Sequence, residues 1–183
     1  FIWAKQMSGT LNEGGFGIAT DNSGNVLITG HFNGTVDFDP GGGVYNLISF
    51  GDFDIFVSKL DVSGNFVWAK QMGGIGGDLS NAIALDPTGN VFITGSFTQT
   101  ADFDPGSGVY NFTAAGRDIF IEKLDMSGNF IWAKQMVGNF AAYGYSLAAD
   151  GLGNVYYTGS FWGTVDFNPG PGIYSLTSIP TDD

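Results

Sequence analysis

The sequence predicts an all-β fold made of tandem four-stranded antiparallel sheets, and three observations support this prediction. The phrase that begins at Phe1 returns at Phe66 and again at Phe130, which are offsets of 65 and 64 residues. No window of about ten or more residues shows a helical apolar period without a Gly inside it. Thirty of the 183 residues are Gly, about twice the usual frequency, which indicates frequent turns.

Runs of β-branched and aromatic residues, bounded by Gly, Asn or Asp, predict four strands in each repeat. In the second repeat these are the Trp-Ala-Lys-Gln-Met phrase, a Ser-Asn-Ala-Ile-Ala-Leu run, a Val-Phe-Ile-Thr-Gly run and an Asp-Ile-Phe-Ile-Glu-Lys-Leu run. They cover residues 66–72, 80–85, 91–97 and 118–124. Successive apolar residues in the last two strands predict sheets that are covered on both faces.

Four short antiparallel strands per unit, with no helix, favour a β-propeller blade over a solenoid coil, whose repeat is about half as long. The repeats cover residues 1–65, 66–129 and 130–183, the last being truncated before its final strands. A blade usually takes about 40 to 50 residues, and the surplus lies at residues 35–53 and 100–117. Residues 1–7 are expected to be an outermost strand whose own blade is otherwise absent.

Charge and composition exclude several classes of function. Lys and Arg total 6 against 18 Asp and Glu, a formal charge of −12, so nucleic acid and anionic membranes would be repelled. A hydrophobic content of 43% provides a sizeable core and excludes intrinsic disorder. The chain has no Cys and one His, which excludes disulfides, thiolate zinc sites and a His pair for a metal. No apolar run approaches a membrane span.

One rim of the blades is expected to consist of tight turns with the pattern Asp-x-x-Gly-Asn. The Asp side chain can accept from backbone amides two residues on, and the Gly supplies a positive φ at no steric cost. The structural turn residues are Gly24, Asn25, Gly64, Asn65, Gly89, Asn90, Gly128, Asn129, Gly153 and Asn154. The opposite rim carries the long insertions, so a ligand would be expected there.

Paired carboxylates recur in the insertions and allow two interpretations. The residues are Asp37, Asp39, Asp102, Asp104, Asp166 and Asn168. Residues two apart on an extended segment share a face, so their oxygens could contribute to a calcium site, which would need about 6 to 8 oxygen ligands. The favoured interpretation is an Asp-Pro-Gly turn that needs no cofactor. Asn168 keeps the acceptor and loses the charge, as turn chemistry permits.

Aromatic residues distinguish the third repeat from the other two. Phe140, Tyr143, Tyr145 and Trp162 replace mainly small or polar counterparts and are expected on the rim with the long insertions. Such a cluster could stack on sugar rings or on another subunit, and local packing is the alternative. The Trp residues at positions 3, 68 and 132 are expected to cover the outer flanks of the blades.

No catalytic constellation can be composed from the sequence. His31 occupies the position that Ser96 and Ser160 fill in the other repeats, which favours ordinary packing over a ligand or catalytic role. Carboxylates recur in every copy at turn positions, which is typical of scaffold residues. A catalytic acid and base would instead need two different environments. We therefore predict no catalytic residues.

Three phrases in fixed order carry a family resemblance across the whole chain. They are D-x-S-G-N-V-x-I-T-G-x-F, D-F-D-P-G and D-I-F-V-x-K-L-D-x-S-G-N-F-x-W-A-K. The sequence resembles the bacterial SBBP family of β-propeller repeats. The resemblance implies a propeller in a secreted or cell-surface bacterial protein, and it implies no catalytic residues.

The prediction for function is a non-catalytic extracellular scaffold for structure or interaction. Closed rings generally need about four to eight blades, so we expect a homo-oligomer or further blades of the same parent chain. The first alternative is a carbohydrate-binding or adhesive module that uses the aromatic rim. The second is a glycan-active enzyme with carboxylate chemistry in a central channel, which nothing unique to one blade supports.

Overall fold

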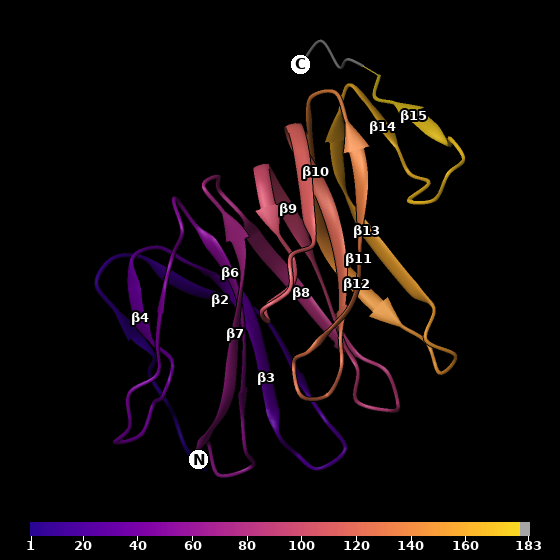
Figure 1. Cartoon of the computed structure of the whole chain (residues 1–183). Helices are drawn as coiled ribbons and strands as arrows, with labels where there is room; N and C mark the ends of the chain where they lie inside the picture. The colour runs from indigo at the N-terminus through magenta and orange to yellow at the C-terminus, as the bar shows by residue number, and fades with distance from the viewer. Residues whose placement is uncertain (180–183) are drawn as a thin grey trace.

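In the computed structural model, which describes residues 1–179, all regular structure is β (Figure 1). The first blade is an antiparallel sheet in the order β2 (Glu13–Thr20), β3 (Val26–Phe32), β6 (Asp54–Leu60) and β7 (Phe66–Gly74). Every residue of β6 is buried, as expected for a strand in a sheet covered on both faces. The predicted all-β, blade-like fold is confirmed.

The second blade repeats this order, and the third contains half of it. The second consists of β8 (Leu79–Leu85), β9 (Val91–Asp102), β10 (Asn111–Leu124) and β11 (Phe130–Gly138). The third consists of β12 (Ala141–Ala149) and β13 (Val155–Trp162), and among the described residues β13 pairs with β12 alone. The four strands expected in the second repeat correspond to β7, β8, β9 and β10.

The insertions form small three-stranded sheets at the outer end of the blades. In the first repeat, β4 (Thr35–Asp37) lies between β1 (Ser8–Gly9) and β5 (Asn46–Ile48). In the third, β14 (Thr164–Asp166) lies between the end of β11 and β15 (Ser175–Thr177). In the second and third repeats the insertion pairs with the end of the outer strand of the preceding blade, so it joins neighbouring blades.

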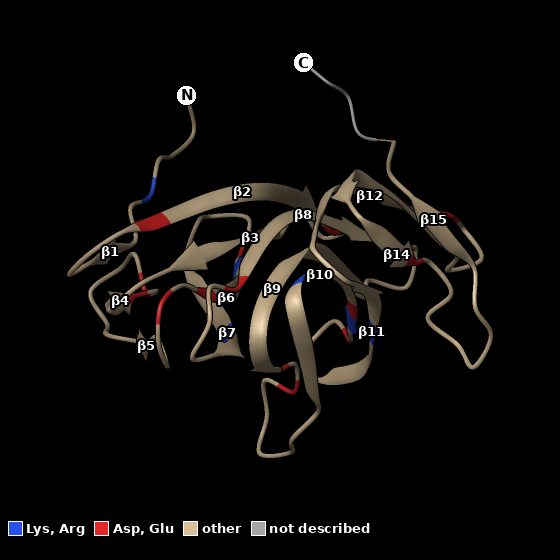
Figure 2. Cartoon of the chain, turned by 90° about the horizontal axis from the view of Figure 1, so that it is seen from above, with Lys and Arg blue, Asp and Glu red and all other residues tan. Residues whose placement is uncertain are grey.

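The three blades lie side by side in an open arc (Figure 2). Their first strands, β2, β8 and β12, are neighbours along one side of this arc. The largest core cluster lies between the first and second blades and includes Leu27, Val57, Ile93 and Phe120. A second cluster, including Ile119 and Val165, lies between the second and third blades. Apolar burial thus occurs between sheets, as stacked blades require.

Two expectations about strands need correction. Residues 1–7 were expected to form a strand, but the structure assigns none there and pairs only Ser8 and Gly9 with β4. A strand needs a ladder partner, and within the described residues no third strand lies beside this segment. The blades are also shifted against the sequence repeats, because β7, which opens the second repeat, is the outer strand of the first blade. The end of the third repeat, residues 180–183, lies outside the described residues.

Candidate functional site

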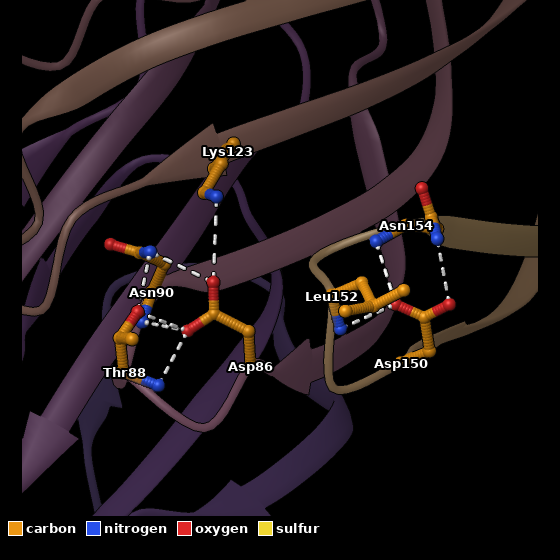
Figure 3. A network of polar contacts seen from close by, with 7 residues as sticks. All are labelled: Asp86, Thr88, Asn90, Lys123, Asp150, Leu152 and Asn154. Carbon is orange, nitrogen blue, oxygen red and sulfur yellow. Dashed lines mark hydrogen bonds and ion pairs between the residues drawn. The ribbon is translucent and has the colours of Figure 1, made fainter.

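The five Asp-x-x-Gly-Asn segments lie in tight turns along one rim of the blades. Asp86 shows the arrangement: Oδ1 accepts the amides of Thr88 at 2.9 Å and Asn90 at 3.0 Å, and Oδ2 accepts the Asn90 side-chain amide at 2.8 Å (Figure 3). Burial raises the pKa of Asp86, but the hydrogen bonds from Thr88 and Asn90 outweigh it and lower the pKa to about 2. The Gly in these turns has φ between 77° and 85°, where a side chain would be strained.

A Lys from the third strand of the blade completes two of these turns. Lys59 Nζ lies 2.9 Å from Asp21 Oδ2, and Lys123 Nζ lies 3.4 Å from Asp86 Oδ2. Lys123 also lies over the ring of Phe92, 4.7 Å from its centre. Asp150 holds the same turn, but no Lys pairs with it within residues 1–179 (Figure 3). The carboxylate in the turn of the third blade therefore has no Lys partner among these residues, and the Tyr156 hydroxyl donates to its Oδ2 at 3.4 Å.

The paired carboxylates of the insertions hold their own loops. In the first copy, Asp37 Oδ1 accepts the amides of Asp39 at 3.0 Å and Tyr45 at 2.8 Å, and Asp39 Oδ1 accepts that of Gly41 at 2.8 Å. The second and third copies repeat these bonds from Asp102, Asp104, Asp166 and Asn168. In the described part of the chain no three His, Cys, Asp or Glu side chains group to hold a metal ion. The calcium hypothesis stays a prediction.

A buried Asp–Gln pair joins the third and fourth strands of each complete blade. Gln71 Nε2 donates to Asp54 Oδ2 at 2.6 Å, and Gln135 Nε2 donates to Asp118 Oδ2 at 2.6 Å. In the second blade, Asp118 Oδ1 also accepts the amide of Gly138 at 2.9 Å. Both oxygens of Asp118 are therefore satisfied although its side chain is buried.

The junction of the first two blades departs from this pattern. The amide of Gly74, which corresponds to Gly138, donates instead to Asp78 Oδ2 at 2.7 Å. Asp54 Oδ1 is consequently buried without a hydrogen-bond partner. Burial raises the pKa of Asp54 to about 6 and that of Asp78 to about 7, and the Asp54 charge adds to the rise at Asp78. This geometry lets one carboxyl keep its proton near neutral pH.

Other groups around this junction are also buried or constrained. Arg117 donates to the carbonyl of Gly77 at 3.2 Å and to Ser96 Oγ at 3.2 Å, and its charge opposes the rise in the pKa of Asp78. His31 stacks on Phe16 with ring centres 4.5 Å apart, and burial lowers the pKa of His31. Since Asp54 and Asp78 are both fully buried, the carboxyl pair is closed to substrate in this structure.

Three of the four selected aromatic residues come together at the opposite rim. Tyr143 stacks with Tyr145 at 6.2 Å between ring centres and meets Trp162 edge-on at 6.1 Å. The guanidinium of Arg117 lies 5.6 Å from the centre of the Tyr143 ring. Phe140 is exposed just before β12, and within residues 1–179 its ring has no aromatic partner. We call Tyr143, Tyr145, Trp162 and Arg117 the aromatic cluster.

Comparison with known proteins decides the repeat class. The β-propeller repeat model of the SBBP family matches residues 67–96 and 131–165. The chain contains SBBP β-propeller repeats. It is also 31% identical, over 202 aligned positions and 96% of its length, to an uncharacterized WD repeat-containing protein of Acanthamoeba polyphaga mimivirus. Regulatory protein FlaEY of Caulobacter vibrioides is 27% identical over 128 positions and 70% of this chain.

The chain spans 14% and 13% of the lengths of these two relatives. The recognition of the repeat family from its three phrases is confirmed. Within the described part of the chain, no helix is long and apolar enough to cross a membrane.

Sequence reasoning missed the polar groups that join the SBBP blades. Departures from the repeat could have indicated them, because Arg117 replaces Phe53 and Asp78 has Ala142 as its counterpart in the third repeat. The Lys of the Lys-Leu-Asp phrase was likewise visible in the sequence. Its partner was not, because the Asp of the turn is brought beside it only by strand pairing.

Proposed function

We propose that the chain is a non-catalytic interaction scaffold, exposed outside the cell or on a bacterial cell surface, that joins further repeats of its own kind. The repeat class and the open arc of stacked sheets support an interaction role. The secretion implied by the family resemblance supports the location. The full burial of Asp54 and Asp78, the carboxyl pair at the junction of the first two blades, supports a non-catalytic role.

The observation that carries the proposal is the contrast between interior and terminal blade faces. Ile83 on β8 faces the first blade and is 8% exposed, whereas its counterpart on β2, Ile18, is 71% exposed. Phe92 of the second blade is fully buried, whereas its counterpart in the third blade, Tyr156, is 62% exposed. Positions that repeat-to-repeat stacking buries are therefore open at both ends of the arc.

Contacts at the junction of the first two blades show how successive blades stack. Gly17 of the first blade lies against the backbone of Ala82 and Ile83 in the second. Across the same junction the hydroxyl oxygens of Thr29 and Ser80 lie 2.7 Å apart, in hydrogen-bond contact. Because one face carries the residues of a preceding blade and the other those of a following blade, copies would add head to tail.

The test is the mass of the chain in solution as its concentration rises, measured by light scattering. We expect particles heavier than the 19.3 kDa chain, and Ile18→Asp or Tyr156→Asp should return the monomer. Val109→Asp is the matched control, because Val109 is also 71% exposed but lies in an insertion. A monomer at every concentration would refute self-association.

A carbohydrate-binding role is a second candidate, and the aromatic cluster favours it. Tyr145 and Trp162 are each 52% exposed, so their rings are open to a ligand, and Arg117 offers hydrogen-bond donors beside them. A glycan array with the intact chain tests this role. Binding that Trp162→Ala and Tyr143→Ala both abolish would support it, and an array without signal would dispose of it.

A further inference from the structure

We propose that the free edge of β13 is an acceptor site for an extended strand that carries a Phe and, three residues later, a Lys. This inference rests on the proposed function, since it names the segment that the third blade would bind. Four features of the third blade define the segment: an open ladder, an apolar cavity, a Thr hydroxyl and the Asp150 carboxylate.

The open ladder provides the main-chain part of the site. In the first two blades the second strand is paired on both sides, β3 with β2 and β6, and β9 with β8 and β10. The corresponding strand β13 pairs with β12 alone among the described residues. Its outer edge therefore presents unpaired backbone groups that an added antiparallel strand can satisfy.

An apolar cavity beside this edge specifies the Phe. It has a volume of about 390 Å³ and is lined by Ile119, Phe161 and Phe167, with β13 along one side. In the second blade the equivalent space is filled by Phe120, whose ring centre lies 5.0 Å from that of Phe103. Phe56 fills it in the first blade, 4.8 Å from Phe38.

The register of the complete blades fixes where that Phe would sit. Phe56 lies opposite Gly30 and Phe120 opposite Gly95, and the counterpart of these glycines on β13 is Gly159. Next to it, Thr29 and Thr94 each donate a side-chain hydroxyl to the carbonyl of the Phe, at 2.9 Å and 2.7 Å. Their counterpart on β13 is Thr158, whose hydroxyl would donate to the carbonyl of the incoming Phe in the same way.

Asp150 specifies the Lys. Lys59 and Lys123 each follow the Phe by three residues and reach the Asp of the first turn in their own blade. Asp150 forms that turn with Leu152 and Asn154 but has no cation beside it within residues 1–179 (Figure 3). The turn hydrogen bonds lower the pKa of Asp150, so it is charged and complementary to an incoming Lys.

A synthetic peptide with the sequence of residues 117–136, which form the third and fourth strands of the second blade, tests the site on the full chain. Calorimetry should show saturable binding with one peptide per chain. Phe120→Ala in the peptide should weaken binding by about 100-fold, because it removes the ring that fills the cavity.

A double-mutant cycle tests the ion pair. Lys123→Met in the peptide or Asp150→Asn in the chain should each weaken binding about tenfold, and the two together should be no worse than either alone. Asp150→Asn is chosen because Asn keeps the acceptor that holds the turn. Equal binding to the normal and Asp150→Asn chains, full affinity of the Phe120→Ala peptide, or no binding of the normal peptide would each overturn the proposal.

This outcome is separable from that of the proposed function. Self-association is measured without peptide. Ile18→Asp is the variant that separates the two outcomes, because Ile18 lies at the far end of the arc from β13, whereas Tyr156 lies on β13. A chain that binds the peptide but stays monomeric would retain the acceptor site and lose the self-association. A chain that self-associates through Ile18 but does not bind the peptide would retain the self-association and lose the acceptor site.

Discussion

The carboxylates of Asp54 and Asp78 come from different blades and meet beside Gly73. A methyl group added at Gly73 would lie 2.8 Å from Asp54 Oδ1 and 3.0 Å from Asp78 Oδ2. Asp78 accepts the amide that serves Asp118 in the second blade, so Asp54 is left one hydrogen bond short. A proton held by one carboxyl relieves both the missing bond and the repulsion of two buried charges.

This pair predicts that the fold loses stability as the pH rises towards neutrality. The pKa of each group in the folded chain, about 6 for Asp54 and about 7 for Asp78, lies above its ordinary value of 3.8. The stabilisation is therefore complete below the ordinary value and is lost as the pH rises through 6 and 7. Since one pKa unit is about 1.4 kcal/mol, the free energy of unfolding should fall by roughly 3 kcal/mol or more.

Urea unfolding at a series of pH values measures this loss. Asp78→Asn is the informative variant, because it keeps an acceptor for the Gly74 amide and removes one charge. Its stability should change less between mildly acidic and mildly alkaline pH than that of the unchanged chain. Arg117 and His31 also face the junction, so Arg117→Met serves as the control that removes the nearby cation. Parallel pH profiles for the chain and Asp78→Asn would contradict the assignment.

The turn carboxylates predict a second loss of stability, in acid. Hydrogen bonds hold the pKa of Asp21 and Asp86 at about 2, below the ordinary value of 3.8. Their contribution is present above the ordinary value and is lost as the pH falls through about 2. Asp86→Ala should cost about 2 kcal/mol at neutral pH, because it breaks four hydrogen bonds and leaves Lys123 unpaired. Asp150→Ala, whose turn has no Lys, should cost less in the same denaturant series; an equal cost would show that Lys123 adds nothing.

We predict that the chain is stable without added calcium, because the carboxylates of the insertions hold their own loops by hydrogen bonds. Asp102 Oδ1 accepts the amides of Asp104 and Tyr110, so Asp102→Ala should lower the free energy of unfolding by about 1 to 2 kcal/mol. Asp102→Asn keeps a carbonyl acceptor for these amides and should be tolerated better. Melting curves with calcium and with a chelator separate the two interpretations, since a rise in melting temperature with calcium that Asp102→Asn removes would support a calcium site.

We predict that replacing Glu122 by an apolar residue stabilises the fold. Its side chain is fully buried, and neither carboxylate oxygen has a hydrogen-bond partner in the described residues. Burial, and then the charges of Asp104 and Asp102, raise its pKa well above the usual range. Glu122→Met removes the buried carboxyl at similar volume and should raise the free energy of unfolding by about 1 to 3 kcal/mol. A loss of stability in thermal or urea unfolding would show that Glu122 has a partner in solution.

The features that could be predicted from the sequence are those that depend on neighbouring residues along the chain. The turns at Asp21 and Asp86 depend on residues within four positions, so the Asp-x-x-Gly-Asn phrase predicts their hydrogen bonds directly. The strand at residues 66–72 was predictable because its phrase recurs. Residues 1–7 carry the same phrase but form no strand, because a phrase supplies the side chains of a strand and not its ladder partner.

The sequence by itself determined the repeat period, the strand phrases and the turn chemistry of this protein. The tertiary structure decided which polar side chains from different strands share a site: Lys123 with Asp86, and Asp54 with Asp78. The physical reason is that strand register and blade stacking bring these groups together across long stretches of chain, and burial then sets their charge. That is also why Asp150, which has the same Asp-x-x-Gly-Asn pattern as Asp21 and Asp86, lacks within residues 1–179 the Lys partner that they have.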